Sequence, residues 1–331
     1  MVQNLFQNHA ILTTPNMEIK PVQKLSKLVV VLGPTASGKT DFSIELAKKF
    51  NGEIISADSR QIYKKMNIGT AKVRGAWQKD KVTGEKVFVY ENIPHHLVDF
   101  IDPGDEFSLA QFKALAIARV NEIISHGKLP MLVGGTGLYI QAVVDNLLIP
   151  AVPPNKKLRQ SLEEKTNQEL VELLKKLDPV ATRTIDADNK RRLIRALEVC
   201  IWTGKTFSGQ QNKGESLFEC LQIGLSVPRD ELNSRIAERA EKMMERGLLE
   251  EVRALVKQRY GWNLPSMSGT GYKQFAGYFK KEISLENTVE LLKRDTRRYA
   301  RRQMTWFKRD AKIKWVDNVA DAAKLIMEFL N

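Results

Sequence analysis

Residues 33–40 read Gly33-Pro34-Thr35-Ala36-Ser37-Gly38-Lys39-Thr40 and follow the apolar run Leu28-Val29-Val30-Val31-Leu32. Phe42, Leu46 and Phe50 then recur at four-residue intervals, the spacing of one helix face. A strand that runs into Gly-x4-Gly-Lys-Thr and then into a helix is the sequence form of the P-loop. A P-loop binds phosphate through its backbone N–H groups, its lysine and the N-terminus of the helix. The Thr40 hydroxyl of such a loop can reach a magnesium ion. The stretch predicts an α/β fold with a phosphate site, but it does not identify the molecule that carries the phosphate.

The charge balance favours an anionic partner. The chain has 331 residues, and 52 Lys and Arg against 39 Asp and Glu give a net charge of +13. The partner can be a nucleic acid, an anionic membrane surface or a phosphorylated substrate. No apolar run approaches the roughly 20 residues that cross a bilayer, so we expect no membrane partner. Two cysteines without a CxxC pair and four scattered histidines argue against a zinc site.

A second buried strand, predicted over residues 53–57, delivers Asp58 at its carboxyl end. In open α/β sheets ligands sit outside the carboxyl ends of strands, so Asp58 should face the phosphate site. This carboxylate can bind magnesium through water or act as a general base. It can also simply cap a helix, because Asp is a good N-cap.

A third strand, predicted over residues 130–133, ends in Gly134-Gly135-Thr136-Gly137. ATP-hydrolysing P-loop enzymes usually place an Asp for the metal here, and its replacement by glycine argues against an ordinary kinase or ATPase. Three glycines in four residues imply that the backbone closely approaches a ligand or another segment.

The remaining pattern predicts a P-loop NTPase-like parallel sheet core flanked by helices, with a mostly helical insertion domain. Residues 1–27 read as a disordered leader, residues 28–148 and 218–331 as the core, and residues 149–217 as the insertion. Ser108 should cap a helix that runs to about Ser125. Residues 72–91 suggest a β-hairpin that makes an excursion from the sheet, and residues 314–316 and 320–330 a last edge strand and a closing helix.

Three groups of basic residues are candidates for anion contacts. Arg191, Arg192 and Arg195 cluster on a predicted helix of the insertion, either as a solvated face or as contacts to a nucleic-acid backbone. Arg235 and Arg239, four residues apart, can clamp a diphosphate or pair with neighbouring glutamates. Residues 285–310 carry eight positive charges on a predicted helix whose seven-residue apolar repeat should face the core, which leaves its arginines exposed to RNA.

Seven ordered motifs resemble the tRNA dimethylallyltransferase family, bacterial type, from about residue 28 to residue 317. They are GPTASGKT (33–40), ISADSRQIYKKMNIGTAK (55–72), IPHHLVD (93–99), LVGGTGLYI (132–140), RRLIRALEV (191–199), GYKQF (271–275) and RRYARRQMTWFKRD (297–310). The family prenylates adenosine 37 beside the tRNA anticodon. The resemblance implies the partners dimethylallyl diphosphate and the tRNA anticodon stem-loop, the cofactor Mg²⁺ near Thr40, and a cytoplasmic enzyme that we expect to be a monomer.

The resemblance also implies roles for individual residues. The diphosphate would lie on Gly33, Thr35, Ala36, Ser37, Gly38, Lys39 and Thr40. Asp58 would be the general base, and Lys39 with Arg235 or Arg239 would stabilise the departing charge. Contacts to tRNA would come from Asp58, Ser59, Arg60, Gln61, Thr136, Arg191, Arg192, Leu193, Ile194 and Arg195.

Two departures and three rivals stand beside this resemblance. The insert at residues 74–92 is longer than the usual connection, and the sequence shows no Cys/His zinc-finger extension of the kind many eukaryotic members have, which favours a bacterial-type enzyme. An adenylate isopentenyltransferase would share the P-loop and Asp58, but it has little use for the arginine-rich helices. The second rival is a P-loop small-molecule kinase, and the third is a non-catalytic RNA-binding protein.

Overall fold

The structure is a computed structural model, and it describes residues 25–79, 84–210 and 212–331. Most of the expected leader, residues 1–24, lies outside the described residues. The leader boundary at residue 27 is wrong by two residues, because strand β1 already begins at Ser26. In the described part of the chain, every helix is too short or too polar to cross a bilayer.

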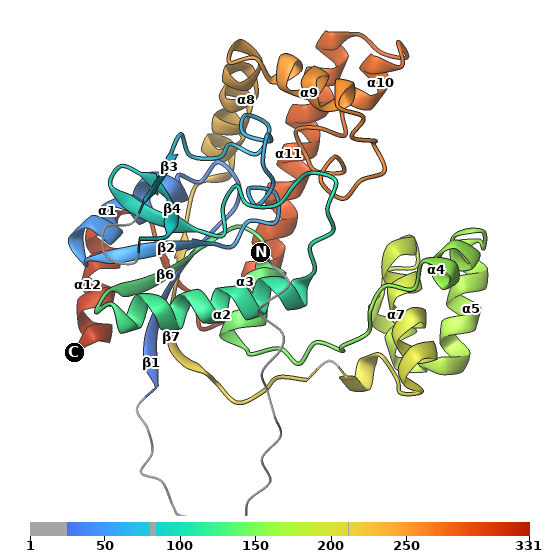
Figure 1. The fold of residues 1–331 in the computed structure, drawn as a ribbon, viewed down its shortest axis with the longest axis horizontal. Helices are drawn as coiled ribbons and strands as arrows, with labels where there is room; N and C mark the ends of the chain where they lie inside the picture. Colours follow the sequence, from blue (N-terminus) through green and yellow to red (C-terminus); the bar gives the residue numbers. More distant parts are fainter. Residues whose placement is uncertain (1–24, 80–83, 211) are drawn as a thin grey trace, which may run out of the picture.

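An eight-stranded sheet forms the centre of the molecule (Figure 1). Its strands are β1 (Ser26–Leu32), β2 (Gly52–Ser56), β3 (Ala76–Lys79), β4 (Lys86–Tyr90), β5 (Ile93–His96), β6 (Leu129–Gly134), β7 (Phe218–Leu225) and β8 (Lys314–Val316). They lie in the order β3-β4-β5-β2-β6-β1-β7-β8. All neighbouring pairs from β5 to β8 in this order are parallel. The pairs β3–β4 and β4–β5 are antiparallel. The hairpin is therefore confirmed, but its expected excursion from the sheet is wrong, because β4 pairs with β5 and the insert extends the sheet edge.

The described helices are arranged around this sheet and in two further groups (Figure 1). They are α1 (Lys39–Lys49), α2 (Leu109–Ser125), α3 (Gly137–Val144), α4 (Lys156–Glu163), α5 (Asn167–Leu177), α6 (Pro179–Thr184), α7 (Lys190–Thr203), α8 (Arg229–Glu245), α9 (Leu248–Lys257), α10 (Phe275–Phe279), α11 (Leu285–Phe307) and α12 (Val319–Leu330), with a 3₁₀ turn, η2 (Ser208–Gln210). The expected cap of α2 is confirmed, since Ser108 and Gln111 form a capping box.

Strand β1 is buried on both faces because its apolar residues are continuous. Leu28, Val30 and Leu32 pack into the cluster made with α2 and α3, and Val29 and Val31 into the cluster made with α1 and α12. The P-loop thus follows a central strand that is fixed between two helical layers.

A third cluster joins α8, α9, α10 and α11 to the segment that follows Asp58. Ile62, Tyr63 and Met66 of that segment pack with Leu248 of α9 and Leu292 of α11. This cluster brings the basic C-terminal helices against the carboxyl edge of the sheet.

Helices α4 to α7 form a separate group that stands off from the sheet (Figure 1). They share their own apolar cluster, to which Leu170, Leu174 and Leu197 contribute. The two connecting segments pair with each other, because the Leu148 N–H donates to the Asn212 carbonyl at 2.8 Å.

Glu198 is the buried ionic centre of this helical group. Its carboxylate accepts hydrogen bonds from Arg159 (2.8 and 2.9 Å), Arg195 (2.7 Å) and the Asn155 N–H (2.8 Å). Burial raises the pKa of Glu198, but these partners, Arg159 first, outweigh it and lower the pKa to about 2. Arg195 therefore stabilises the helical group by pairing with this buried carboxylate.

We expect Glu198→Gln to lower the free energy of unfolding by about 1–3 kcal/mol at pH 7, less than for a fully buried pair because both arginines are about one-third exposed. Since the folded pKa lies below the ordinary 4.5, the stabilisation is present above that value and is lost as the pH falls towards 2. Urea unfolding at pH 7 and pH 3 measures this. Glu172→Gln, at an exposed position on α5, is the control. An effect of Glu198→Gln that does not shrink at pH 3 would contradict the ionic assignment.

Candidate active site

The P-loop is held in a conformation that opens the first turn of α1 to an anion. Ala36 and Gly38 have left-handed backbones, with φ of 64° and 86°. Gly38 is the N-cap of α1 and has no side chain to cover the helix N–H groups. The helix N-terminus is thus a ready anion site.

Lys39 folds back onto its own loop. Its Nζ donates to the Pro34 carbonyl at 2.6 Å and to Ser37 Oγ at 3.4 Å. Burial lowers the pKa of Lys39 to about 7, while the Asp58 charge opposes this shift and Arg239 adds to it. An anionic ligand on the loop would stabilise the charged form of Lys39 and oppose this lowering of its pKa.

Asp58 lies just beyond the carboxyl end of β2, as the sequence predicts, and it caps the following turn. Its Oδ1 accepts from the Arg60 N–H (2.8 Å) and the Gln61 N–H (3.4 Å), which caps the following turn. Its charge also raises the pKa of Lys39 and of Arg239 against the effect of their burial. The charge of Asp58 therefore acts at the P-loop (residues 33–40, the phosphate cradle), while its Oδ1 caps the turn.

The glycine loop after β6 (residues 134–137) closely approaches other segments of the chain, which is one of the two explanations of its glycines. A Cβ on Gly134 would lie 2.2 Å from the Ala57 carbonyl oxygen, and one on Gly137 would lie 2.3 Å from the Trp306 ring. Thr136, between them, accepts a hydrogen bond from the Ser59 N–H at 3.1 Å. The loop thus joins the Asp58 segment to α11.

Arg235 and Arg239 both reach the P-loop from α8. Arg235 Nη1 donates to the Ser37 carbonyl and Arg239 Nη1 to Thr35 Oγ1, each at 3.4 Å. Arg235 also pairs with Glu231, the kind of helix-surface pairing that its spacing allows. Burial lowers the pKa of Arg239, and the Asp58 charge opposes this. Two guanidinium groups therefore border the cradle.

The polar side chains of the segment after Asp58 hydrogen-bond to backbone carbonyls of the protein. Arg60 donates to the Pro265 carbonyl, and Gln61 Nε2 to the Thr70 and Ala71 carbonyls, each at 3.3 Å. Both side chains are therefore engaged within the protein.

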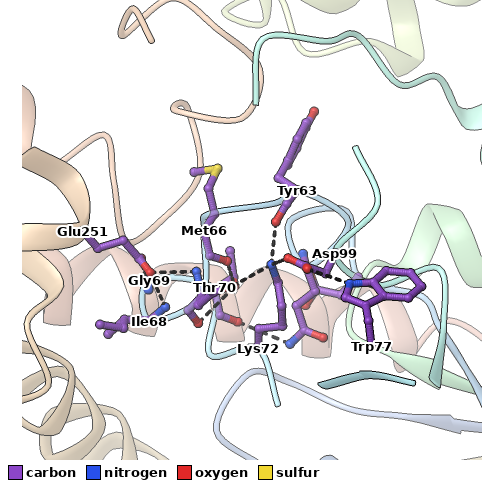
Figure 2. A network of polar contacts seen from close by, with 12 residues as sticks. Tyr63, Met66, Ile68, Gly69, Thr70, Lys72, Trp77, Asp99 and Glu251 are labelled. Carbon is purple, nitrogen blue, oxygen red and sulfur yellow. Dashed lines mark hydrogen bonds and ion pairs between the residues drawn. The ribbon is translucent and has the colours of Figure 1, made fainter. Parts of the chain in front are cut away.

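Lys72 and Glu251 fix the far end of this segment (Figure 2). Lys72 Nζ donates to the Tyr63 carbonyl (2.5 Å) and to Asp99 Oδ1 (2.6 Å), and its side chain is 2% exposed. Glu251 of α9 accepts from three successive backbone N–H groups, those of residues 67–69, at 2.8 to 3.0 Å. Asp99 also accepts from Trp77, which links the edge hairpin to this network.

We expect Lys72→Met to lower the free energy of unfolding by about 3 kcal/mol, because Asp99 and the Tyr63 carbonyl lose a buried cation. Turnover should fall as well, since the Asp58 segment loses its anchor. Urea unfolding and a steady-state assay measure both effects. Lys48→Met, which removes an exposed pair with Glu91, is the control and should cost at most about 1 kcal/mol. Equal losses in the two variants would refute the network's role.

The donor set fits a magnesium ion that is held mainly by a substrate. Groups of three or more His, Cys, Asp or Glu side chains able to hold a metal are absent from the described residues. Mg²⁺ commonly binds through one or two protein oxygens together with substrate phosphates and waters. Thr40, at the start of α1, offers one such oxygen beside the cradle.

The expected tRNA residues fall into two places. Ser59, Arg60, Gln61 and Thr136 lie beside Asp58, whereas residues 191–195 belong to the separate helical group. Within the latter, Leu193 and Ile194 are 0% and 4% exposed, so their side chains face the helical core and not a ligand. Arg191 and Arg192 are exposed.

Helix α11 presents an arginine face, as its sequence predicts. Arg294, Arg297, Arg298, Arg301 and Arg302 are exposed, while Leu292, Ala300 and Phe307 are buried. The apolar repeat is confirmed at Leu292, and the other two members, Tyr299 and Trp306, are partly buried.

Gln303 is the site residue that the sequence reasoning missed. Its side chain is among the buried polar groups and reaches both the P-loop and the glycine loop. A signal was present, because Gln303 lies four residues after Tyr299 and three before Trp306. A polar residue on the apolar face of a helix needs a buried partner.

Comparisons with known proteins agree with this architecture. Residues 61–310 match the family profile described as IPP transferase, and residues 26–89 match the profile described as Isopentenyl transferase. The chain is 44% identical over 300 residues to the tRNA dimethylallyltransferase of Acetivibrio thermocellus, covering 88% of this chain and 92% of the relative. It is 43% identical over 311 residues to that of Halothermothrix orenii, covering 92% and 91%.

Solved structures give the same result. The full-length tRNA isopentenylpyrophosphate transferase of Bacillus halodurans superposes with a TM-score of 0.65 at 38% identity, covering 92% of this chain and 95% of the other. A eukaryotic dimethylallyltransferase described as acting on tRNA superposes with a TM-score of 0.72 at 28% identity, covering 88% and 74%. The fold is therefore the P-loop NTPase-like α/β fold of these enzymes, and the chain belongs to the tRNA dimethylallyltransferase family of prenyl transferases.

Proposed function

We propose that this protein transfers the dimethylallyl group from dimethylallyl diphosphate to N6 of adenosine 37 in tRNA and releases diphosphate. It acts on the anticodon stem-loop, as a monomer, in the cytoplasm. The observation that supports the proposal is that the charge of Asp58 raises the pKa of Lys39 and of Arg239, two cations that contact a P-loop whose neighbouring strand ends in glycine. Such a site suits a leaving diphosphate better than a nucleotide that is hydrolysed with a second acid.

The cradle binds the group that departs. Backbone N–H groups of the P-loop and the N-terminus of α1 bind the diphosphate, and Lys39, Arg235 and Arg239 stabilise the charge that grows as the C1–O bond breaks. Thr40 would be the protein ligand of a bound Mg²⁺, which would neutralise part of that charge. These groups lower the barrier because they are oriented before the reaction starts.

Asp58 serves the attacking amine. Adenosine N6 forms the bond to C1 of the allyl group as the C1–O bond breaks, and the amine proton passes to the Asp58 carboxylate. Because Oδ1 already accepts two backbone N–H groups, the carboxylate is held in one orientation. Among the described residues the hydrogen bonds to Asp58 reach Oδ1, which leaves Oδ2 for the substrate.

The acceptor side is basic and suits a nucleic-acid backbone. The exposed arginines of α11, between residues 294 and 302, come just before Gln303 and Trp306, which pack on the glycine loop. A bound RNA backbone would therefore lie beside Thr136 and Ser59. Exposed arginines bind phosphates and make the affinity for RNA fall with salt. The target adenine has to leave its stack to reach Asp58.

Free adenine nucleotides are the second candidate acceptor, because residues 26–89 also match the isopentenyl transferase profile. The test supplies dimethylallyl diphosphate and Mg²⁺ with either unmodified tRNA or AMP, and quantifies prenylated adenine by mass spectrometry. The proposal requires transfer to tRNA. Transfer to AMP alone would reject it in favour of an adenylate isopentenyltransferase, and ATP-dependent phosphorylation without prenylation would reject both in favour of a kinase.

A further inference from the structure

Gln303 lies at a junction of three segments that are far apart in the sequence. Its Oε1 accepts a hydrogen bond from the Thr35 N–H at 2.8 Å, and its Nε2 donates to the Gly135 carbonyl at 2.7 Å. The residue is 6% exposed. One buried amide of α11 therefore satisfies a P-loop donor and a glycine-loop acceptor at once.

The glycine loop is shaped around this side chain. A Cβ on Gly135 would lie 2.3 Å from Gln303 Nε2 and 3.3 Å from the Gly33 carbonyl oxygen. No side chain other than hydrogen fits there without displacing the amide or the P-loop. The Gln303 amide of α11 therefore fills the space between the P-loop and the glycine loop and hydrogen-bonds to both.

A series of contacts leads from Gln303 to Asp58, the proposed general base. Gly135 precedes Thr136, whose Oγ1 accepts from the Ser59 N–H, and Ser59 follows Asp58. On the other side, Thr35 is in the cradle and contacts Arg239. Gln303 thus contacts the P-loop directly through Thr35, and it is linked to Asp58 through Gly135, Thr136 and Ser59.

We propose that Gln303 is a positioning residue, which sets the separation between the diphosphate cradle and the Asp58 side of the site. The proposal rests on the proposed function, because it concerns the two halves of that reaction centre. Gln303 acts through Thr35 and Gly135 and needs no contact with the substrate. A side chain of equal length without hydrogen-bonding groups leaves both loops unsatisfied and free to shift.

The test uses Gln303→Met, which keeps the length and removes both hydrogen bonds, and Gln303→Asn, which keeps the amide but is one methylene too short to reach both loops. Thr288→Val is the matched control, because Thr288 is a fully buried polar residue of the same helix whose hydroxyl bonds locally to the Ser284 carbonyl. Thermal unfolding ranks the general damage in the three variants.

Two readouts separate positioning from simple destabilisation. Calorimetry with inorganic diphosphate and Mg²⁺ measures the affinity of the P-loop for diphosphate. Steady-state assays at saturating tRNA measure kcat. We expect both Gln303 variants to bind diphosphate about fivefold more weakly and to lose about tenfold or more in kcat, with tRNA affinity within about twofold of wild type. Thr288→Val should keep wild-type values for both readouts.

Diphosphate affinity and kcat within twofold of wild type in a folded Gln303→Met or Gln303→Asn protein would overturn the proposal and leave Gln303 a packing residue. The diphosphate measurement does not depend on prenyl transfer. A wild-type protein that fails to prenylate tRNA would therefore count against the proposed function, whereas unchanged diphosphate affinity in the variants counts against the role of Gln303.

Discussion

Asp58→Asn should reduce turnover by about 10²–10⁴-fold, the range that general base catalysis contributes, while tRNA affinity stays within about twofold. The substitution removes the proton acceptor but keeps an oxygen that can accept from the Arg60 and Gln61 N–H groups, so the turn should survive. Single-turnover assays at saturating donor and tRNA measure the loss, and gel-shift titration measures tRNA binding.

Asp58→Ala serves as the companion variant. It removes both the base and the cap of the turn, so it should lose turnover to at least the same extent and also lose some stability. Near-normal turnover in either variant would remove Asp58 from the catalytic role. Equal loss of turnover and of tRNA binding would instead make Asp58 a residue that holds the RNA.

Lys39→Met should lower kcat by about 10²–10³-fold, because the growing charge of the leaving diphosphate loses its nearest ammonium group. The desolvated position of Lys39, which lowers its pKa to about 7, indicates a site organised for an anionic ligand. Binding of inorganic diphosphate should weaken in parallel, and tRNA affinity should remain. Calorimetry and steady-state kinetics measure the three quantities.

Lys49→Met, at the far end of the same helix, is the matched control and should change neither diphosphate binding nor kcat. If Lys39→Met behaves like this control, the P-loop does not hold the leaving group.

The sequence predicts those parts of the fold that local chemistry decides. The P-loop, the capped helix after Ser108, and β8 with α12 follow from glycine placement, a capping residue and apolar periodicity within short windows. The edge position of β3 and β4 could not be predicted in this way. Strand pairing depends on a distant partner, here β5, and no signal within the hairpin names it.

The candidate site shows the same division. Asp58, Lys39 and Thr136 follow strands whose parallel order places their carboxyl ends together, so their meeting is predictable. The contacts of Gln303 join residues that are 268 and 168 positions apart, and only the three-dimensional structure identifies them.

The residues carried over from the family motif show a different limit. A contiguous stretch such as residues 191–195 includes both faces of a helix, and its apolar members Leu193 and Ile194 turn inward. Arg195 donates a hydrogen bond to the buried Glu198 carboxylate, whose charge is stabilised by this cation. Within this stretch the helical period, and not the motif, decides which side chains can meet RNA.

The proposed function requires that the P-loop holds a leaving diphosphate while a tRNA adenosine attacks. The most direct measurement incubates the protein with dimethylallyl diphosphate, Mg²⁺ and tRNA transcripts that carry either A or G at position 37. It quantifies N6-dimethylallyladenosine and released diphosphate together. We expect one diphosphate for each modified adenosine, and neither product with G37. Diphosphate release without adenosine modification, or equal modification of the G37 transcript, would contradict the proposed function.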